Sequence, residues 1–113
     1  TGESGSMKCQ VIFTDTAKSD LREIAMYLAE RSKDKQFAIR FVKELQEETK
    51  ILEAFPESGA IPRDYILKCS EFRFLTYKDY LLFYRYEREE SRAYVLAVFH
   101  GKRDYMRVMR KFL

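Results

Sequence analysis

The chain has 113 residues, 46% of them hydrophobic and 15% aromatic, and a formal net charge of +3. This length and composition are enough for one hydrophobic core but not for two, so we expect residues 7–113 to form a single domain. The uncharged apolar runs are far shorter than the ~20 residues of a membrane-spanning helix, so no membrane segment is expected. Residues 1–6 resemble the remnant of an expression tag and are set aside.

The cysteine and histidine content argues against a metal site. Cys9 and Cys69 lie far apart without CxxC spacing, and His100 is the only histidine. This pattern predicts neither a disulfide framework nor a zinc site, and it fits a reducing cytoplasm. We therefore expect a cytoplasmic protein with no metal and no cofactor.

The N-terminal half has the pattern of one strand followed by two helices. Residues 9–14 are apolar and β-rich. Asp15-Thr16 then provides an N-cap for a helix that should end near residue 32. After a short connection, apolar residues recur at helical spacing over 37–55 and predict a longer second helix, which the next residue, a proline, ends. Two helices joined by so short a link should form an antiparallel hairpin.

The C-terminal half has the pattern of a β-meander. A loop leads to three runs, 72–77, 80–86 and 93–99, which are rich in aromatic and β-branched residues and are separated by short polar segments. They predict three antiparallel strands. In the loop we expect at most a short strand at 65–67. The end of the chain should form a final basic helical turn or two.

This order of elements predicts an α+β fold, in which an N-terminal strand and the meander form a small, mainly antiparallel sheet and the helical hairpin covers one face. Strict alternation places Phe83, Val95 and Ala97 on one face and Tyr84 and Leu96 on the other. Because both sets are apolar, we expect the second face to be half open and partly buried by the loop or by a bound protein. The expected core consists of Leu21, Ile24, Leu28, Phe37, Phe41, Leu45, Leu52, Phe83, Val95 and Ala97.

Candidate functional residues gather after the last predicted strand. Histidine is the side chain whose charge ordinarily changes near neutral pH, so His100 suits a general acid or base, although a lone histidine at a strand end is more often structural. Arg73 and Arg103 suit the binding of a phosphate or carboxylate. Their structural alternatives are an ion pair for Arg103 and, for Arg73, a side chain that packs over the sheet with its head group in water.

The positive charge surplus lies in the C-terminal half. Residues 56–113 carry twelve Lys/Arg against eight Asp/Glu, whereas residues 15–55 carry eight against nine. A basic C-terminal surface suits nucleic acid or an acidic protein, and its alternative is a solvated face that aids solubility. The candidate binding residues are Lys102, Arg103, Arg107, Arg110 and Lys111.

A series of short motifs, taken in order and spacing, resembles the RelE/ParE superfamily of bacterial toxins, which includes plasmid stabilisation proteins. The resemblance implies a RelE/ParE-like fold and a growth-inhibiting toxin that is neutralised by an antitoxin encoded beside it. The motifs are Ala17 with Asp20-Leu21, Leu52, Phe55-Pro56-Glu57-Ser58-Gly59, Arg73, Tyr80-Leu81-Leu82-Phe83-Tyr84-Arg85, and Val98-Phe99-His100-Gly101-Lys102-Arg103-Asp104.

The resemblance implies one of two activities. One branch of the superfamily cleaves messenger RNA on the ribosome, and the other inhibits DNA gyrase without being a hydrolase. In RelE-like nucleases a cleft arginine and a C-terminal tyrosine align with Leu81 and Met109 of this chain. Both departures remove groups that would stabilise a phosphorane or transfer a proton. The motifs therefore favour the ParE-like branch, with gyrase as the target.

Two alternatives stay open. A toxin fold that has lost its activity would serve only as a binding module. The enzymatic alternative is a metal-independent, ribosome-dependent endoribonuclease (an mRNA interferase) with the ribosome and mRNA as partners. Its acid, base and phosphate-binding set would be Arg73, His100, Lys102 and Arg103.

Overall fold

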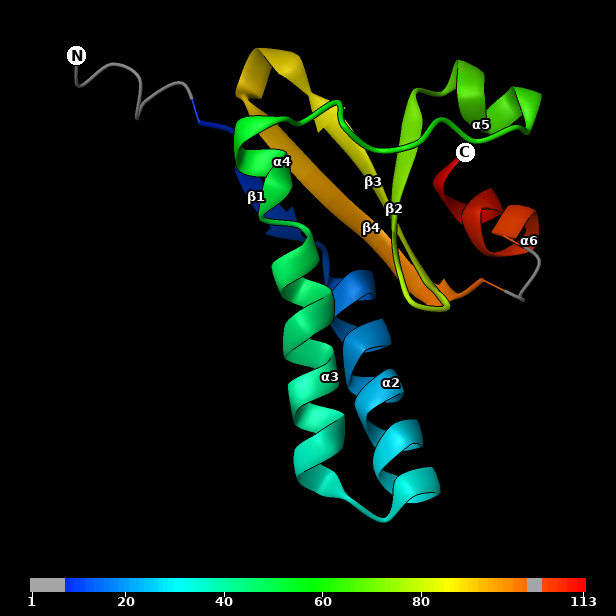
Figure 1. Ribbon diagram of the computed structural model, residues 1–113. Helices are drawn as coiled ribbons and strands as arrows, with labels where there is room; N and C mark the ends of the chain where they lie inside the picture. The colour runs from blue at the N-terminus through cyan, green and yellow to red at the C-terminus, as the bar shows by residue number, and fades with distance from the viewer. Residues whose placement is uncertain (1–7, 102–104) are drawn as a thin grey trace.

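The computed structural model describes residues 8–101 and 105–113 and is built around a four-stranded sheet with the strand order β1-β4-β3-β2 (Figure 1). β1 pairs with β4 in parallel, and the other two pairs are antiparallel. The predicted α+β fold with a C-terminal meander is therefore confirmed. The strands are β1 (Gln10–Phe13), β2 (Phe72–Tyr77), β3 (Tyr80–Glu87) and β4 (Arg92–His100), with a 3-10 turn, η1 (Arg88–Glu90), between the last two.

The helical hairpin consists of α2 (Asp15–Ser32) and α3 (Lys35–Glu48) and extends past the lower end of the sheet in Figure 1. The helix starts at Asp15, two residues before the predicted first helical residue Ala17, because Thr14 and not Asp15-Thr16 is the N-cap. The Thr14 Oγ1 atom accepts a hydrogen bond from the Ala17 N–H at 3.2 Å. A β-region residue with a side-chain oxygen is what an N-cap requires, and Thr14 is in that region.

The second helix is shorter than predicted. It ends at Glu48, and a separate turn of helix, α4 (Ile51–Ala54), follows. At the break the Thr49 N–H donates to the Gln46 carbonyl and its hydroxyl donates to the same carbonyl. These bonds to the third residue back tighten the helix and end the regular pattern, although the apolar periodicity continues to Leu52.

The loop before the meander contains a helix where a short strand was considered. α5 spans Tyr65–Cys69. Its N-cap is Asp64, whose carboxylate accepts hydrogen bonds from the Ile66 and Leu67 N–H groups at 2.9 and 3.1 Å. The cap selects a helical turn over an extended segment, and the turn buries Leu67 completely.

A β-bulge alters the predicted alternation of the meander. Phe83 pairs with Ala97 and Tyr84 pairs with Val95, so Leu96 has no partner on β3. A residue left out of the ladder shifts every later side chain on that strand to the opposite face. Val95 therefore packs with Tyr84 against the hairpin, and Leu96 packs with Ala97 on the second face. The prediction placed these two residues on the wrong faces.

The second face of the sheet is covered more completely by the chain itself than predicted. α5 packs on it together with α6 (Tyr105–Met109) and a 3-10 turn, η2 (Arg110–Phe112), at the C-terminus (Figure 1). Met109 is fully buried against this face. The basic helical turn at the end of the chain is thus ordered, because its apolar side supplies the cover that we had expected from the loop or from a bound protein.

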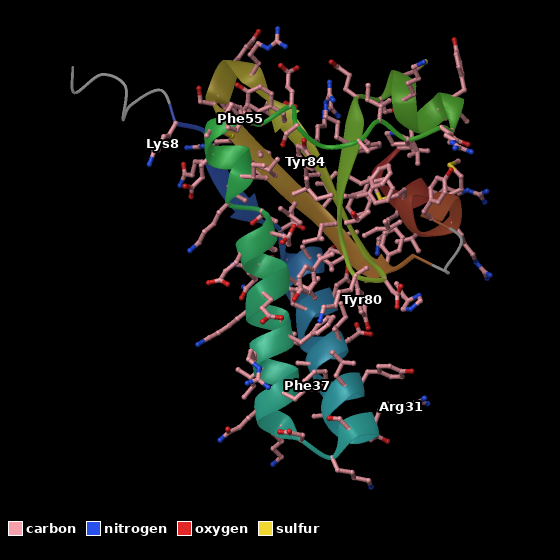
Figure 2. All side chains as sticks on the ribbon, in the orientation of Figure 1. Lys8, Arg31, Phe37, Phe55, Tyr80 and Tyr84 are labelled. Carbon is pink, nitrogen blue, oxygen red and sulfur yellow. The ribbon has the colours of Figure 1, made fainter. Side chains whose placement is uncertain are left out.

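The core matches most of the predicted set. Eight of the ten residues are buried, and the other two, Leu28 and Phe37, are partly buried. Figure 2 shows Phe37 on the part of the hairpin that extends beyond the sheet. The two apolar layers, one on each face of the sheet, hold the molecule together. No helix among residues 8–101 and 105–113 is both long and apolar enough to cross a membrane.

Replacing Phe41 by alanine should lower the free energy of unfolding by about 3–5 kcal/mol. The ring is 7% exposed and lies 5.5 Å, centroid to centroid, from both Tyr77 and Tyr80, so its loss leaves a cavity at the centre of the hairpin–sheet contact. Denaturant melts would measure the change. Phe55→Ala, at a ring that is 64% exposed, is the matched control and should cost less than about 1 kcal/mol. Equal losses in the two variants would contradict this packing.

The Tyr77 hydroxyl donates a hydrogen bond to the Glu44 carboxylate of α3 and should titrate late. This bond, followed by partial burial and nearby acids, raises the pKa of Tyr77 to about 12. Because the folded pKa is raised, the contribution to stability is present below pH ~10 and is lost between about 10 and 12. Burial also raises the pKa of Tyr80 and Tyr84, so a phenolate absorbance titration should show several late tyrosines, and Glu44→Gln should return one of them, Tyr77, toward the ordinary range. A titration that Glu44→Gln leaves unchanged would exclude the bond.

Candidate functional site

The structure does not bring the predicted catalytic residues together. Arg73 pairs with Tyr84 across the β2–β3 ladder, whereas His100 pairs with Tyr80. Four residues of β3 separate these positions, about 13 Å along the strand. Lys102 and Arg103 lie outside the described residues. Arg73 and His100 are therefore parts of two different places on the molecule.

Arg73 holds the turn that follows α4. Its guanidinium donates hydrogen bonds to the carbonyl oxygens of Glu57 and Gly59 at 3.0 and 3.1 Å. The side chain also lines the cleft described below, and neither sequence-based interpretation included these two hydrogen bonds. Both bonds come from one guanidinium nitrogen, whose two N–H groups reach the two carbonyls.

Tyr84 completes the same unit from the sheet. Its hydroxyl donates to the Pro56 carbonyl at 2.7 Å and accepts from the Gly59 N–H at 2.9 Å. Figure 2 labels Tyr84 on the sheet beneath this part of the chain. Burial is the main cause that raises the pKa of Tyr84, so the hydroxyl keeps its proton and can make both bonds. A Cβ atom at Gly59 would lie 2.6 Å from the Tyr84 ring, which requires glycine at that position.

One hydrogen-bonded unit thus joins Arg73 and Tyr84 to the backbone of the turn at Pro56, Glu57 and Gly59, and we call this unit the turn clamp. The sequence had suggested a cleft position for Arg73, and it had placed Tyr84 in a family motif and on one face of the sheet. The sequence feature that could have indicated this unit is the joint presence of Pro56, Gly59 and a tyrosine on a strand. The spacing could not reveal the contact, because Gly59 and Tyr84 are 25 residues apart.

His100 lies at the end of β4 against an aromatic ring. Its ring is 5.4 Å from that of Tyr80, centroid to centroid, at 73°. The side chain is only partly buried. Next to it the Gly101 N–H donates to the Asp79 carbonyl at 2.7 Å, which joins the end of β4 to the β2–β3 turn. His100 is thus placed at an accessible strand end, near the residues where the C-terminal segment begins.

The positions that would carry nuclease chemistry are apolar and packed. Leu81 and Met109 both belong to the hydrophobic cluster on the second face of the sheet, and Met109 is 0% exposed. Phe83 and Phe99 stack in this cluster with centroids 5.5 Å apart. The contact between the C-terminal segment and the sheet is therefore filled mainly by apolar side chains, with the Tyr105 ring stacked on Phe83 at 6.0 Å, centroid to centroid.

The C-terminal cations lie on the outside of that segment. Arg107 is on α6, and Arg110 and Lys111 are on η2; all three are exposed. Burial of Met109 fixes the segment so that its opposite side faces solvent. The described part of the predicted binding set thus forms an exposed basic surface, which we call the C-terminal basic surface.

A cleft of about 650 Å³ opens at the other end of the sheet, between the turn clamp, α5 and η1. Sequence reasoning did not predict it. Arg88 and Glu57 pair across it at 2.9 Å, and Arg85 pairs with Glu87 at 3.1 Å. Because its cations are matched by acids, the cleft has no strong preference for an anion. Within the described ranges, no group of three or more His, Cys, Asp or Glu side chains is arranged to hold a metal ion.

Comparisons with known proteins agree on the kind of fold. The family model described as the ParE toxin of the type II toxin–antitoxin system parDE matches residues 11–105. Among curated proteins, none matches the chain. A structure of the chromosomal ParDE system from P. aeruginosa is similar with a TM-score of 0.70 and 17% identity, over 85% of this chain and 99% of that one.

Two further solved structures are similar. The RelBE2 toxin–antitoxin complex from Mycobacterium tuberculosis has a TM-score of 0.61 and 23% identity, over 82% of this chain and 91% of that one. The isolated E. coli RelE toxin has a TM-score of 0.51 and 15% identity, over 93% and 99%. At these identities the likeness shows the fold alone.

Replacing Arg73 by alanine should lower the free energy of unfolding by about 1–3 kcal/mol, because two carbonyl acceptors of the turn clamp, one exposed and one partly buried, lose their charged donor. Denaturant melts followed by circular dichroism would measure it. Arg85→Ala on the neighbouring strand is the control and should cost less than about 1 kcal/mol, since its ion pair is exposed. If Arg73→Ala leaves stability unchanged and still removes growth inhibition, Arg73 contacts the target and the turn clamp does not depend on it.

Proposed function

Because this chain belongs to the ParE toxin family of type II toxin–antitoxin systems, we propose that it inhibits growth by binding DNA gyrase through its C-terminal basic surface. The family model covers residues 11–105, most of the chain. Under this proposal the protein is not a hydrolase, needs no cofactor, and acts through the affinity of its surface for the target.

The observation that supports binding over catalysis is the packing of Leu81 and Met109. In the nuclease branch these positions would offer an arginine and a tyrosine beside the C-terminal segment. Here both are members of the apolar cluster that fixes this segment on the sheet. The separation of Arg73 from His100 across the sheet also supports binding over catalysis.

The proposal includes a cognate antitoxin as a partner. The solved ParDE and RelBE2 structures that share this fold are described as toxin–antitoxin systems. The apolar side chains that this chain leaves exposed give such a partner a surface to bury. Co-expression with the product of the neighbouring gene should raise the soluble yield and give one complex on gel filtration. A chain that is inert in cells and ignores that product would contradict the toxin assignment.

Reversing the charge of the C-terminal basic surface tests the target. The triple variant Arg107→Glu, Arg110→Glu, Lys111→Glu should lose inhibition in a gyrase supercoiling assay, because complementary charge becomes like charge. All three are exposed, so the melting curve should stay normal. The control carries the same charge change at exposed positions elsewhere, Lys8→Glu, Arg31→Glu and Arg40→Glu. Full inhibition by the C-terminal variant would reject the contact surface.

Replacing His100 by glutamine separates the two branches. If gyrase is bound, loss of one polar contact should weaken inhibition by only about 1–3 kcal/mol of binding free energy. If the protein is a ribosome-dependent endoribonuclease, loss of a proton-transfer group should lower mRNA cleavage by about 10²- to 10⁴-fold. Primer extension of mRNA in a translating extract, run beside the supercoiling assay, measures both. Wild-type cleavage on ribosomes that His100→Gln eliminates would establish the nuclease instead.

A further inference from the structure

The layer that covers the second face of the sheet carries the chain's surplus of positive charge. It consists of residues 63–69, which include α5, and residues 105–113, which form α6 and η2, and we call it the cover layer. Its five cations are Arg63, Lys68, Arg107, Arg110 and Lys111, and its single acid is Asp64. Because the whole chain has a net charge of only +3, the rest of the chain is close to neutral. The positive potential is therefore concentrated on this layer.

Buried apolar residues hold the two parts of the cover layer together. Leu67 of α5 and Met109 of α6 are both 0% exposed and belong to one hydrophobic cluster on the sheet. Figure 1 shows α5 and α6 on the same side of the sheet, away from the helical hairpin. All five cations of the layer are exposed. Cations that are far apart in the sequence thus share one outer surface.

Ion pairs do not neutralise the cations of the cover layer. Among residues 8–101 and 105–113, no ion pair includes either cation of the 63–69 part, and none includes Arg110 or Lys111. The carboxylate of Asp64 is the N-cap of α5 and accepts hydrogen bonds from two N–H groups of that helix. The ion pairs that do occur lie near η1, where acids match the cations of the cleft. The cover layer therefore keeps its positive charge for an anionic partner.

An exposed tyrosine lies among these cations. Tyr65 is the first residue of α5 and is 76% exposed, the highest value among the exposed large hydrophobic residues that the structure describes. No hydrogen bond or ring contact between described residues engages its side chain. Lys68 follows one helical turn later, on the same side of α5. A tyrosine hydroxyl beside cations is able to donate a hydrogen bond to a phosphate oxygen.

The composition of the cover layer is closer to that of a DNA-binding surface than to that of a protein-binding surface. Interfaces between proteins bury an apolar centre and are depleted in lysine. Interfaces between protein and DNA are much more positively charged, and most of their hydrogen bonds go to phosphate and sugar. Five exposed cations against one acid match the second description. Three of the five are arginines, whose planar fork of donors suits phosphate oxygens.

We propose that the cover layer binds the phosphate backbone of duplex DNA. In a complex with gyrase, the DNA that the enzyme holds is then the direct partner of the C-terminal basic surface, and residues 63–69 extend this contact through Arg63 and Lys68. Phosphates lie on the outside of the duplex, so exposed cations reach them without a pocket for a base. The contact is therefore independent of the DNA sequence and sensitive to salt.

The part of this inference that concerns gyrase rests on the proposed function, whereas DNA binding by the cover layer stands without it. Arg63 and Lys68 are not part of the C-terminal basic surface, so changing them tests the inference separately. A chain that binds duplex DNA but does not inhibit gyrase would reject the proposed function only. A chain that inhibits gyrase without binding duplex DNA would reject this inference only.

The test measures how the full chain binds a short, labelled DNA duplex of mixed sequence, by fluorescence anisotropy between ~50 and ~200 mM salt. The double variant Arg63→Gln with Lys68→Gln removes two of the five cations. At ~0.1 M salt it should bind at least about tenfold more weakly than wild type. The slope of log affinity against log salt should fall in magnitude by about 2, because each lost phosphate contact accounts for ~0.9. In the supercoiling assay the double variant should need correspondingly more protein for half inhibition.

The matched control, Arg31→Gln with Arg40→Gln, removes two exposed cations of the hairpin and should bind the duplex as wild type does. Circular dichroism checks folding, and if the double variant does not fold, Arg110→Gln with Lys111→Gln takes its place with the same expected change. Unlabelled duplex, RNA of the same length and polyglutamate are compared as competitors. The inference is overturned if the wild-type chain does not bind the duplex, if the folded variant binds it as wild type does, or if RNA or polyglutamate competes better than unlabelled duplex.

Discussion

Both layers of packing depend on the bulge at Leu96 in β4. Because this residue has no partner on β3, Val95 faces the helical hairpin while Ala97 faces the C-terminal segment. Thr14 holds the bulge in place: its N–H donates to the Val95 carbonyl at 3.1 Å, and its hydroxyl lies 3.1 and 3.3 Å from the Val95 and Leu96 carbonyls. The same Thr14 side chain caps α2, so the start of the hairpin and the register of the sheet are fixed together.

At the β2 edge of the sheet, the turn clamp fixes the turn after α4 to the strands. Tyr84 comes from the centre of the sheet and Arg73 from β2, and both bind the backbone of the turn after α4. The ladder continues there with the Ala60–Phe74 bridge. Residues that suggested a polar site in the sequence thus have a structural task. A short motif shared by a family can be shared because of folding as well as because of function.

The molecule presents its exposed charge in separate regions with different chemistry. The C-terminal cations lie outside an apolar anchor at Met109, and the cleft near η1 balances its cations with acids. Under the proposed function the toxin contacts a target and an antitoxin, and separate surfaces would allow each contact to be lost independently. A catalytic mechanism would instead require its groups to converge, and Arg73 and His100 do not.

The sequence by itself determined the order of elements, the α+β class, the hairpin and most of the core. These depend on local periodicity and on turn residues, which act over a few positions. It also indicated the toxin family through motifs in order. The helix at 65–69 could also have been predicted, because Asp64 is a good N-cap, but the strand propensity of Tyr65 to Leu67 favoured the prediction of a short strand.

Only the tertiary structure decided the faces of β4, the contacts of Arg73 and the cover of the second face of the sheet. Each of these results from contacts between residues far apart in the chain, such as Thr14 with Val95 and Gly59 with Tyr84, and no local pattern records where a hydrogen bond over such a separation will form.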